Sequence, residues 1–230
     1  MEETKRVKYD IIGLSETKRK EKLQATWADG SGVFIGARLT GSTSGGVGFI
    51  VAKHVLPQAR SVRFLSHRIA TLEVAVTKKL SALIVQVYAP TLDADDATHE
   101  DFYDELRDAI RSVPAYYKIV IGDFNARVGP RTGAEAFIGS ESSETRNDSG
   151  ERLASFCETN HLFHCNSFFK KSMDRRWTHA GPGGTHRHEL DHILCNRRCF
   201  TEVGVVPSFN TGSDHRHLRA NFHSSSHHEA

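Results

Sequence analysis

The chain has 230 residues, a formal net charge of +2 and a mean hydropathy of −0.43, with 38% hydrophobic and 25% charged residues. These values are typical of a globular protein that can bury a substantial core, and no apolar run is long enough to cross a bilayer. So small a net charge neither requires nor excludes a nucleic-acid partner, because a local basic patch matters more than the total.

The first residues, Met1 to Lys5, lack the apolar core of a secretory signal, so we expect an intracellular protein. Its four cysteines are then expected to be reduced thiols, since disulfide frameworks belong to oxidising compartments. Their spacing matches no standard zinc finger, and structural zinc is the minor alternative.

Short strands that end beside polar groups are predicted in the first half of the chain. Residues 9–14 form an apolar run that predicts a buried strand, with Glu16 just beyond its end. Residues 69–76 and 80–88 predict an antiparallel hairpin, which places Tyr88 at another strand end.

A glycine-rich stretch, Gly-Gly-Val-Gly at residues 45–48, admits two interpretations. A loop that cradles phosphate would be followed by a helix with Lys-Ser/Thr, and this chain has none there. Residues 32–36 and 45–51 therefore predict short strands joined by a Gly/Ser turn.

Two amphipathic helices are predicted. Residues 98–110 carry apolar side chains at intervals of four, with Thr98 as the expected cap and Pro114 beyond the end. Residues 149–159 predict a second helix, which the Asn-Asp-Ser cluster at 147–149 can cap.

Between these helices, the apolar run Lys118 to Ile121 leads into Gly122, Asp123 and Asn125. If the backbone stays extended through Asn125, its side chain and that of Asp123 point to the same face, because side chains alternate along a strand. An ordinary Asp/Asn turn after a strand is an equally good interpretation of these residues alone.

The last third of the chain supplies further polar groups. Asp191 lies inside a predicted strand and needs a partner, because an unpaired buried charge is costly. Asp214 and His215 precede the final strand. In order, the residues from 129 onward predict an exposed loop at 129–149, strands at 162–169, 189–194 and 218–222, and a polar tail at 224–230.

We expect these strand ends to converge on one edge of a sheet sandwich. If Glu16, Asp123 and Asp214 came within about 5 Å, each pair would repel by roughly 3 kcal/mol at an effective dielectric of about 20. Such a cluster must take up a proton or bind a cation. Its oxygen ligands suit Mg²⁺ or Mn²⁺ bound jointly with a substrate phosphate.

Five motifs follow one another along the chain: Leu14-Ser15-Glu16, Tyr88-Ala89-Pro90, Gly122-Asp123-Phe124-Asn125, Leu190-Asp191-His192 and Ser213-Asp214-His215. In this order they resemble the exonuclease-endonuclease-phosphatase superfamily. Within it they are most similar to the apurinic-endonuclease-like domains of LINE-type (non-LTR) retrotransposons and their host-derived relatives. The resemblance implies an α/β fold, a four-layered α/β sandwich of two packed mixed β-sheets flanked by helices, in one domain of residues 1–223.

The same resemblance implies roles in metal-assisted hydrolysis. Glu16 would be the main metal ligand, and Asp214 would support the metal or the leaving group. Asp123 would orient and deprotonate the attacking water, Asn125 would hold the phosphate in the transition state, and Tyr88 would contact the scissile phosphate.

The remaining implied roles concern the phosphate oxygens. His215, oriented by Asp191, would stabilise these oxygens, while Thr178 and Ser213 would contact the phosphate or a neighbouring strand. The metal ion and the oriented His215 would together promote in-line hydrolysis. In the family this reaction nicks DNA and leaves a 3′-hydroxyl.

The chain departs from the family pattern at its N-terminus. Family members begin with a strand that carries an Asn near the metal, whereas Met1 to Lys8 contain no Asn and no apolar strand. We therefore expect an N-terminally truncated domain that lacks this strand and has impaired activity. A smaller departure, His179 and Gly183, replaces a more regular turn and bears on substrate fit.

The expected function is Mg²⁺-dependent nicking of DNA by a monomer that makes no membrane contact and is nuclear if DNA is its substrate. One alternative on the same fold is a phosphatase or phosphodiesterase for small phosphorylated molecules. The other is a catalytically inactive remnant that only binds nucleic acid.

Overall fold

The computed structural model describes residues 8–142, 144–184, 186–209 and 212–224. Two compact units are described separately, the first from Lys8 to Phe124 and the second from Asn125 onward. The expected absence of an N-terminal strand falls on Met1 to Val7, outside the described residues, as does nearly all of the predicted tail. Within the described part of the chain, no helix is both long and apolar enough to cross a membrane.

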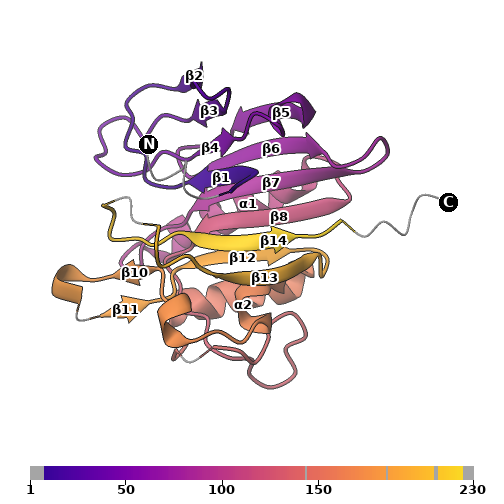
Figure 1. The fold of residues 1–230 in the computed structure, drawn as a ribbon. Helices are drawn as coiled ribbons and strands as arrows, with labels where there is room; N and C mark the ends of the chain where they lie inside the picture. The colour runs from indigo at the N-terminus through magenta and orange to yellow at the C-terminus, as the bar shows by residue number, and fades with distance from the viewer. Residues whose placement is uncertain (1–7, 143, 185, 210–211, 225–230) are drawn as a thin grey trace. The chain divides into compact units, whose positions relative to one another are not determined.

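The first unit begins with a four-stranded antiparallel sheet in the order β1-β4-β3-β2 (Figure 1). Its strands are β1 (Ile11–Leu14), β2 (Leu23–Thr26), β3 (Gly32–Ile35) and β4 (Gly48–Val51). β4 is buried along its whole length, as its apolar run predicts. The glycine-rich stretch before it leads into this strand, so the hairpin interpretation is confirmed.

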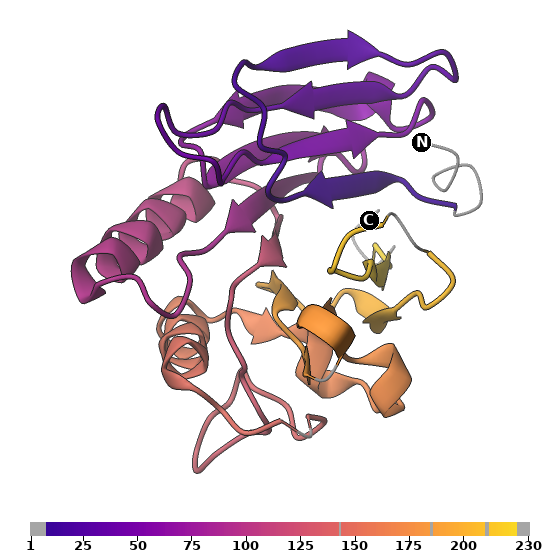
Figure 2. The same cartoon turned by 90° about the vertical axis from the view of Figure 1, so that its left-hand side faces the viewer.

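The second sheet of this unit contains β5 (Ala59–Phe64), β6 (Ile69–Ala75), β7 (Ser81–Tyr88) and β8 (Tyr117–Asp123), after a short 3₁₀ turn at Leu56–Gln58. The first three strands pair antiparallel, and β7 and β8 pair parallel. Parallel neighbours need a crossover, and α1 (Asp96–Arg111) provides it and packs against β6 and β7 (Figure 2). The two sheets meet where Gly13 of β1 lies against Gln86 and Ile121, with no room for a larger residue.

The second unit contains α2 (Asp148–Asn160), which packs against β9 (Phe163–His164), and β9 pairs antiparallel with β12 (Asp191–Cys195). Two antiparallel hairpins complete it: β10 (His179–Ala180) with β11 (Arg187–His188), and β13 (Phe200–Val205) with β14 (Leu218–Phe222). Its 3₁₀ turns are Cys165–Phe168, Met173–Arg175 and Pro182–Gly184. The predicted fold class, a mixed α/β fold with packed sheets and flanking helices, is confirmed.

Several local predictions were wrong. Asp95, not Thr98, caps α1, since its carboxylate accepts the Thr98 N–H at 2.8 Å. The strand predicted at 162–169 stops at His164 and continues as a 3₁₀ turn. The loop at 129–149 is not wholly exposed, because it buries Ile138.

All four cysteines are free and buried, as expected for reduced thiols. The sulfur atoms of Cys195 and Cys199 lie 3.1 Å apart. Among the described residues, no group of three or more His, Cys, Asp or Glu side chains could hold a metal ion by itself. The described part of the structure therefore gives no support to structural zinc.

A pair of histidines occupies the core of the second unit. His164 and His192 are each 1% exposed, and Nε2 of His164 lies 2.9 Å from Nδ1 of His192. Nε2 of His192 lies 2.7 Å from the carbonyl oxygen of Ala126. A carbonyl can only accept, so His192 carries a proton on Nε2, and a hydrogen bond from Nε2–H of His164 to Nδ1 of His192 is compatible with this contact.

Burial, and then electrostatic interactions with His192, Arg146 and Arg176, hold the pKa of His164 well below its usual value. In the unfolded chain this ring takes up a proton below about pH 6.5, while the folded chain keeps it neutral. The unfolded state then binds more protons, so the free energy of unfolding must fall as the pH drops.

We predict that this loss approaches about 1.4 kcal/mol for each pH unit below about 6.5. Urea unfolding at several pH values between 7.5 and 5 measures it. His164→Gln should reduce the pH dependence of the free energy of unfolding by the amount that His164 contributes. The glutamine amide can still donate to His192 but does not titrate. An unchanged pH dependence in the variant would contradict the assignment.

Gly122, next to the end of β8, has a backbone that only glycine adopts readily, with φ of 140°. A Cβ there would overlap the carbonyl oxygen of Val87 in the neighbouring strand. We predict that Gly122→Ala lowers the free energy of unfolding by about 3 kcal/mol.

Gly181→Ala is the control for this substitution, because the nearest atoms to its Cβ lie at 3.7 Å and its φ is ordinary. We expect it to change stability by no more than about 0.5 kcal/mol. Urea denaturation of both variants makes the comparison. Equal free energies of unfolding would show that the approach of residue 122 to the Val87 carbonyl does not affect stability.

Candidate functional site

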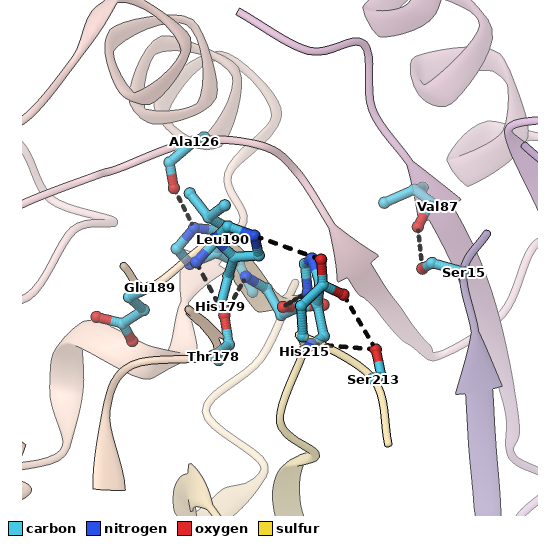
Figure 3. Close-up of polar contacts among 12 residues, drawn as sticks. Ser15, Val87, Ala126, Thr178, His179, Glu189, Leu190, Ser213 and His215 are labelled. Atoms are coloured by element: carbon cyan, nitrogen blue, oxygen red, sulfur yellow. Dashed lines mark hydrogen bonds and ion pairs between the residues drawn. The ribbon is translucent and has the colours of Figure 1, made fainter. Parts of the chain in front are cut away.

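The segment that follows β1 is held in a fixed conformation. Ser15 donates its hydroxyl to the carbonyl of Val87 at 3.1 Å and accepts the Gln86 amide at 2.8 Å (Figure 3). Glu16 and Lys18 have left-handed backbones, with φ of 51° and 57°. Such values are uncommon outside glycine, so the surroundings must impose them.

Two glycines impose part of this conformation. The N–H groups of Thr17 and Lys18 each donate at 3.0 Å, to the carbonyls of Gly46 and Gly45 respectively. Both glycines have positive φ, and a Cβ on Gly46 would lie 2.5 Å from the Thr17 hydroxyl. The Gly/Ser turn thus sets where the Glu16 backbone runs.

Glu16 meets Tyr88, as the strand-end argument predicts. The phenol of Tyr88 donates to Glu16 Oε1 at 2.6 Å, and Lys18 Nζ lies 3.4 Å from Glu16 Oε2. Asp123, only 4% exposed, stands beside Tyr88 in the register of the parallel pair β7 and β8. The structure therefore brings three of the predicted residues together in the first unit.

The electrostatics of this group centre on the phenol. Burial raises the pKa of Tyr88 well above its usual value, and the hydrogen bond and charge of Glu16 and the charge of Asp123 raise it further. Arg68 acts in the opposite direction, with its guanidinium carbon 5.5 Å from the centre of the ring. The phenol therefore remains a hydrogen-bond donor at neutral and moderately alkaline pH.

The second unit holds a histidine and a carboxylate in contact. His215 Nδ1 lies 2.8 Å from Asp191 Oδ2, with the two side chains 30% and 19% exposed (Figure 3). The carboxylate accepts from Nδ1, so this contact fixes the orientation of the His215 ring. The predicted pairing of these two residues is observed.

Buried polar side chains hold the backbone around Asp191. Thr178, which is fully buried, accepts the N–H groups of Leu190 and Asp191 at 2.9 and 3.0 Å. Asn166 donates to the Asp191 carbonyl at 3.0 Å and accepts the Ile193 N–H at 3.0 Å. Of the two contacts expected for Thr178, phosphate or neighbouring strand, this structure contains the strand contact.

The segment before β14 carries the last predicted residues. Ser213 Oγ accepts the His215 N–H at 3.1 Å and donates to Asp214 Oδ1 at 3.3 Å. The Asp214 side chain is 69% exposed and lies 3.8 Å from Nε2 of His179. The centroids of the His179 and His215 rings lie 4.9 Å apart, so His179 is a neighbour of His215. Sequence analysis had placed His179 only in a variant loop.

Asn125 differs from its prediction. β8 ends at Asp123, and Asn125 has a left-handed backbone with φ of 49°. The extended conformation was therefore wrong, and with it the argument that alternation places Asp123 and Asn125 on one face. Asn adopts this region more readily than most residues, which favours the turn interpretation.

The first unit offers carboxylate oxygens, the type of ligand that a hard divalent cation prefers. Glu16 and Asp123 both act on the phenol of Tyr88, and Mg²⁺ is commonly held by one or two carboxylates together with waters and a substrate phosphate. Because no larger ligand cluster exists among the described residues, the remaining oxygens would have to come from water and substrate.

Known proteins similar to this chain include craniofacial development protein 2 of Bos taurus, 29% identical over 225 residues, which are 96% of this chain and 37% of that protein. The same protein of Tragulus javanicus is also 29% identical over 225 residues. The chain thus spans less than two fifths of the length of these curated relatives.

Among solved structures, a variant of the 3′ phosphatase NExo from Neisseria, bound to a product DNA hairpin, matches with a TM-score of 0.64 and 16% identity, covering 93% of this chain and 88% of that one. Truncated TDP2 from Caenorhabditis elegans matches with a TM-score of 0.55 and 13% identity, covering 96% and 87%. At such identities these likenesses concern the fold. Residues 1–215 match the model of the Endonuclease/Exonuclease/phosphatase family, and the chain belongs to this family.

Proposed function

We propose that the chain is a metal-dependent phosphodiester hydrolase that nicks DNA and leaves a 3′-hydroxyl, of the type found in LINE-type retrotransposons and their host-derived relatives. The observation that carries the proposal is the His215–Asp191 contact of 2.8 Å, built on a backbone that Thr178 and Asn166 hold in place. Family membership supports phosphoester hydrolysis as the reaction class. The ordered sequence motifs support the retrotransposon type.

Glu16, with support from Asp214, would hold a Mg²⁺ or Mn²⁺ ion, which when bound supplies positive charge to the phosphate in the transition state. Asp123 accepts a proton from the water whose oxygen attacks phosphorus. The P–O3′ bond breaks, the leaving oxygen takes a proton from solvent water and is released as the 3′-hydroxyl, and the phosphate remains on the 5′ end of the neighbouring nucleotide. The phenol of Tyr88 remains protonated and can donate a hydrogen bond to the scissile phosphate.

The second unit supplies the other donors. Asn125 offers its amide to the phosphate, and His215 donates to a phosphate oxygen on which charge develops. Asp191 is a positioning residue, because it orients the imidazole without touching substrate. The Ser213 hydroxyl contacts the phosphate, while Thr178 acts through the backbone of Asp191.

A second candidate function is removal of a terminal phosphate or cleavage of a small phosphodiester. It is favoured by the similarity in fold to NExo, a 3′ phosphatase. The same donors would serve this reaction, since phosphomonoesters and phosphodiesters develop negative charge on the same kind of oxygen. Fold alone does not choose between these substrates.

Nicking of supercoiled plasmid DNA with Mg²⁺ tests the proposal. We predict that Asp123→Ala and His215→Ala each lower the nicking rate by about 10²-fold or more, and that EDTA abolishes it. Asp108→Ala and His54→Ala are matched controls at exposed positions and should nick at the wild-type rate.

The same proteins assayed on 3′-phosphorylated oligonucleotides and small phosphate esters separate the alternatives. Phosphate release without nicking would replace the endonuclease by a phosphatase. DNA binding with neither activity would mean that the chain only binds nucleic acid.

Asp191→Asn provides a separate test of the His215–Asp191 contact. The amide keeps the shape of the carboxylate but loses its charge, so the imidazole is no longer held with one fixed proton arrangement. We predict that kcat for nicking falls by about 10²-fold with little change in KM. Asp174→Asn, on a side chain that is 66% exposed, is the matched control, and an equal loss in both would contradict the assigned role.

A further inference from the structure

The turn that contains Asn125 is fixed at each of the next two residues. The Ala126 carbonyl accepts the Nε2–H of His192 at 2.7 Å. The N–H of Arg127 donates to Asn147 Oδ1 at 3.0 Å, and its carbonyl accepts the Asn147 N–H at 3.1 Å. Asn147 also caps α2, so the turn is attached directly to the start of that helix.

The contact at Ala126 comes from a residue of β12, whereas the contacts at Arg127 come from Asn147 at the start of α2. His192 directly follows Asp191 in β12, and side chains of successive strand residues point to opposite faces. Asp191 contacts His215 on one face, and His192 contacts the Ala126 carbonyl on the other. β12 thus contacts His215 through Asp191 and the turn that contains Asn125 through His192.

The orientation of the His192 ring is itself fixed. His164 donates to its Nδ1 at 2.9 Å, and both rings are buried. Nδ1 of His164 has no hydrogen-bond partner among the described residues, so this histidine has no other polar contact through its ring. A buried acceptor without a partner is costly, which indicates that the pair is kept for the contact it makes at Ala126.

We propose that His192 is a positioning residue for Asn125, which it holds in the left-handed conformation through the Ala126 carbonyl, with His164 fixing the His192 ring. The inference rests on the proposed function, in which the Asn125 amide contacts the phosphate. The alternative is that the histidine pair is only a part of the core, with no bearing on Asn125.

A double-mutant cycle distinguishes these two roles. His192→Phe preserves an aromatic ring but removes the donor, and Asn125→Gly removes the amide while tolerating a positive φ. Nicking is measured under single-turnover conditions in both single variants and in the double variant. We expect His192→Phe to lower kcat by about tenfold or more with KM within about twofold of wild type.

In the Asn125→Gly background, His192→Phe should have little further effect, because no amide remains to be positioned. His99→Phe, which replaces a buried histidine of α1, is the matched control and should change the rate by the same factor in both backgrounds. An equal loss from His192→Phe in both backgrounds would overturn the inference.

His192→Gln covers the case in which His192→Phe does not fold, because its amide can reach the Ala126 carbonyl. We expect it to recover part of the rate, and a folded His192→Gln protein with no recovery and an additive effect would also overturn the inference. Failure of the proposed function is recognised separately, since the wild-type protein would then not nick the plasmid, or Asn125→Gly and His215→Ala would nick it as fast as wild type.

Discussion

The parallel register of β7 and β8 is the constraint on which the first half of the candidate site depends. It sets Tyr88 beside Asp123, so that a phenol and a buried carboxylate share one end of the sheet. The crossover through α1 makes this pairing possible, and the small size of Gly122 lets the strands approach there. Glu16 reaches the same phenol because Ser15 and the carbonyls of the 45–46 turn hold the backbone on either side of it.

The polar contacts of the second unit depend on buried side chains that hold the backbone around Asp191. Thr178 and Asn166 are almost completely buried, and they occupy the N–H and C=O groups around Asp191. A strand with such contacts on both sides has little freedom to shift. Asp191 of β12 orients the imidazole of His215, and a β-bridge between His179 and His215 holds the His215 backbone.

Sequence reasoning succeeds here wherever an apolar run or helical spacing dominates. The strands around Ile12, Val85 and Val120 were predicted, and so was a convergence of strand ends such as that of Tyr88 and Glu16. The pairing of Asp191 with His215 was implied by the family resemblance. β2 and β5 were missed because exposed residues alternate with half-buried ones and leave no apolar run.

The errors at the site itself have a different origin. Asn125 could be extended or left-handed by local preference, and long-range contacts decide between these conformations. Nothing near His192 in the sequence indicates that its partner is a carbonyl 66 residues away. Motifs thus indicate which polar residues gather at strand ends, whereas the side chains that fix backbone geometry become visible only in three dimensions.

The glycines at 45 and 46 show how far this dependence reaches. They resemble a phosphate-binding loop in sequence, yet their carbonyls fix the backbone beside Glu16, about thirty residues earlier in the chain. A substitution at this turn would therefore displace the backbone beside Glu16, although neither glycine has a side chain of its own. A comparison of sequences that considers only the chemistry of side chains would overlook both glycines, because they act through their backbone carbonyls.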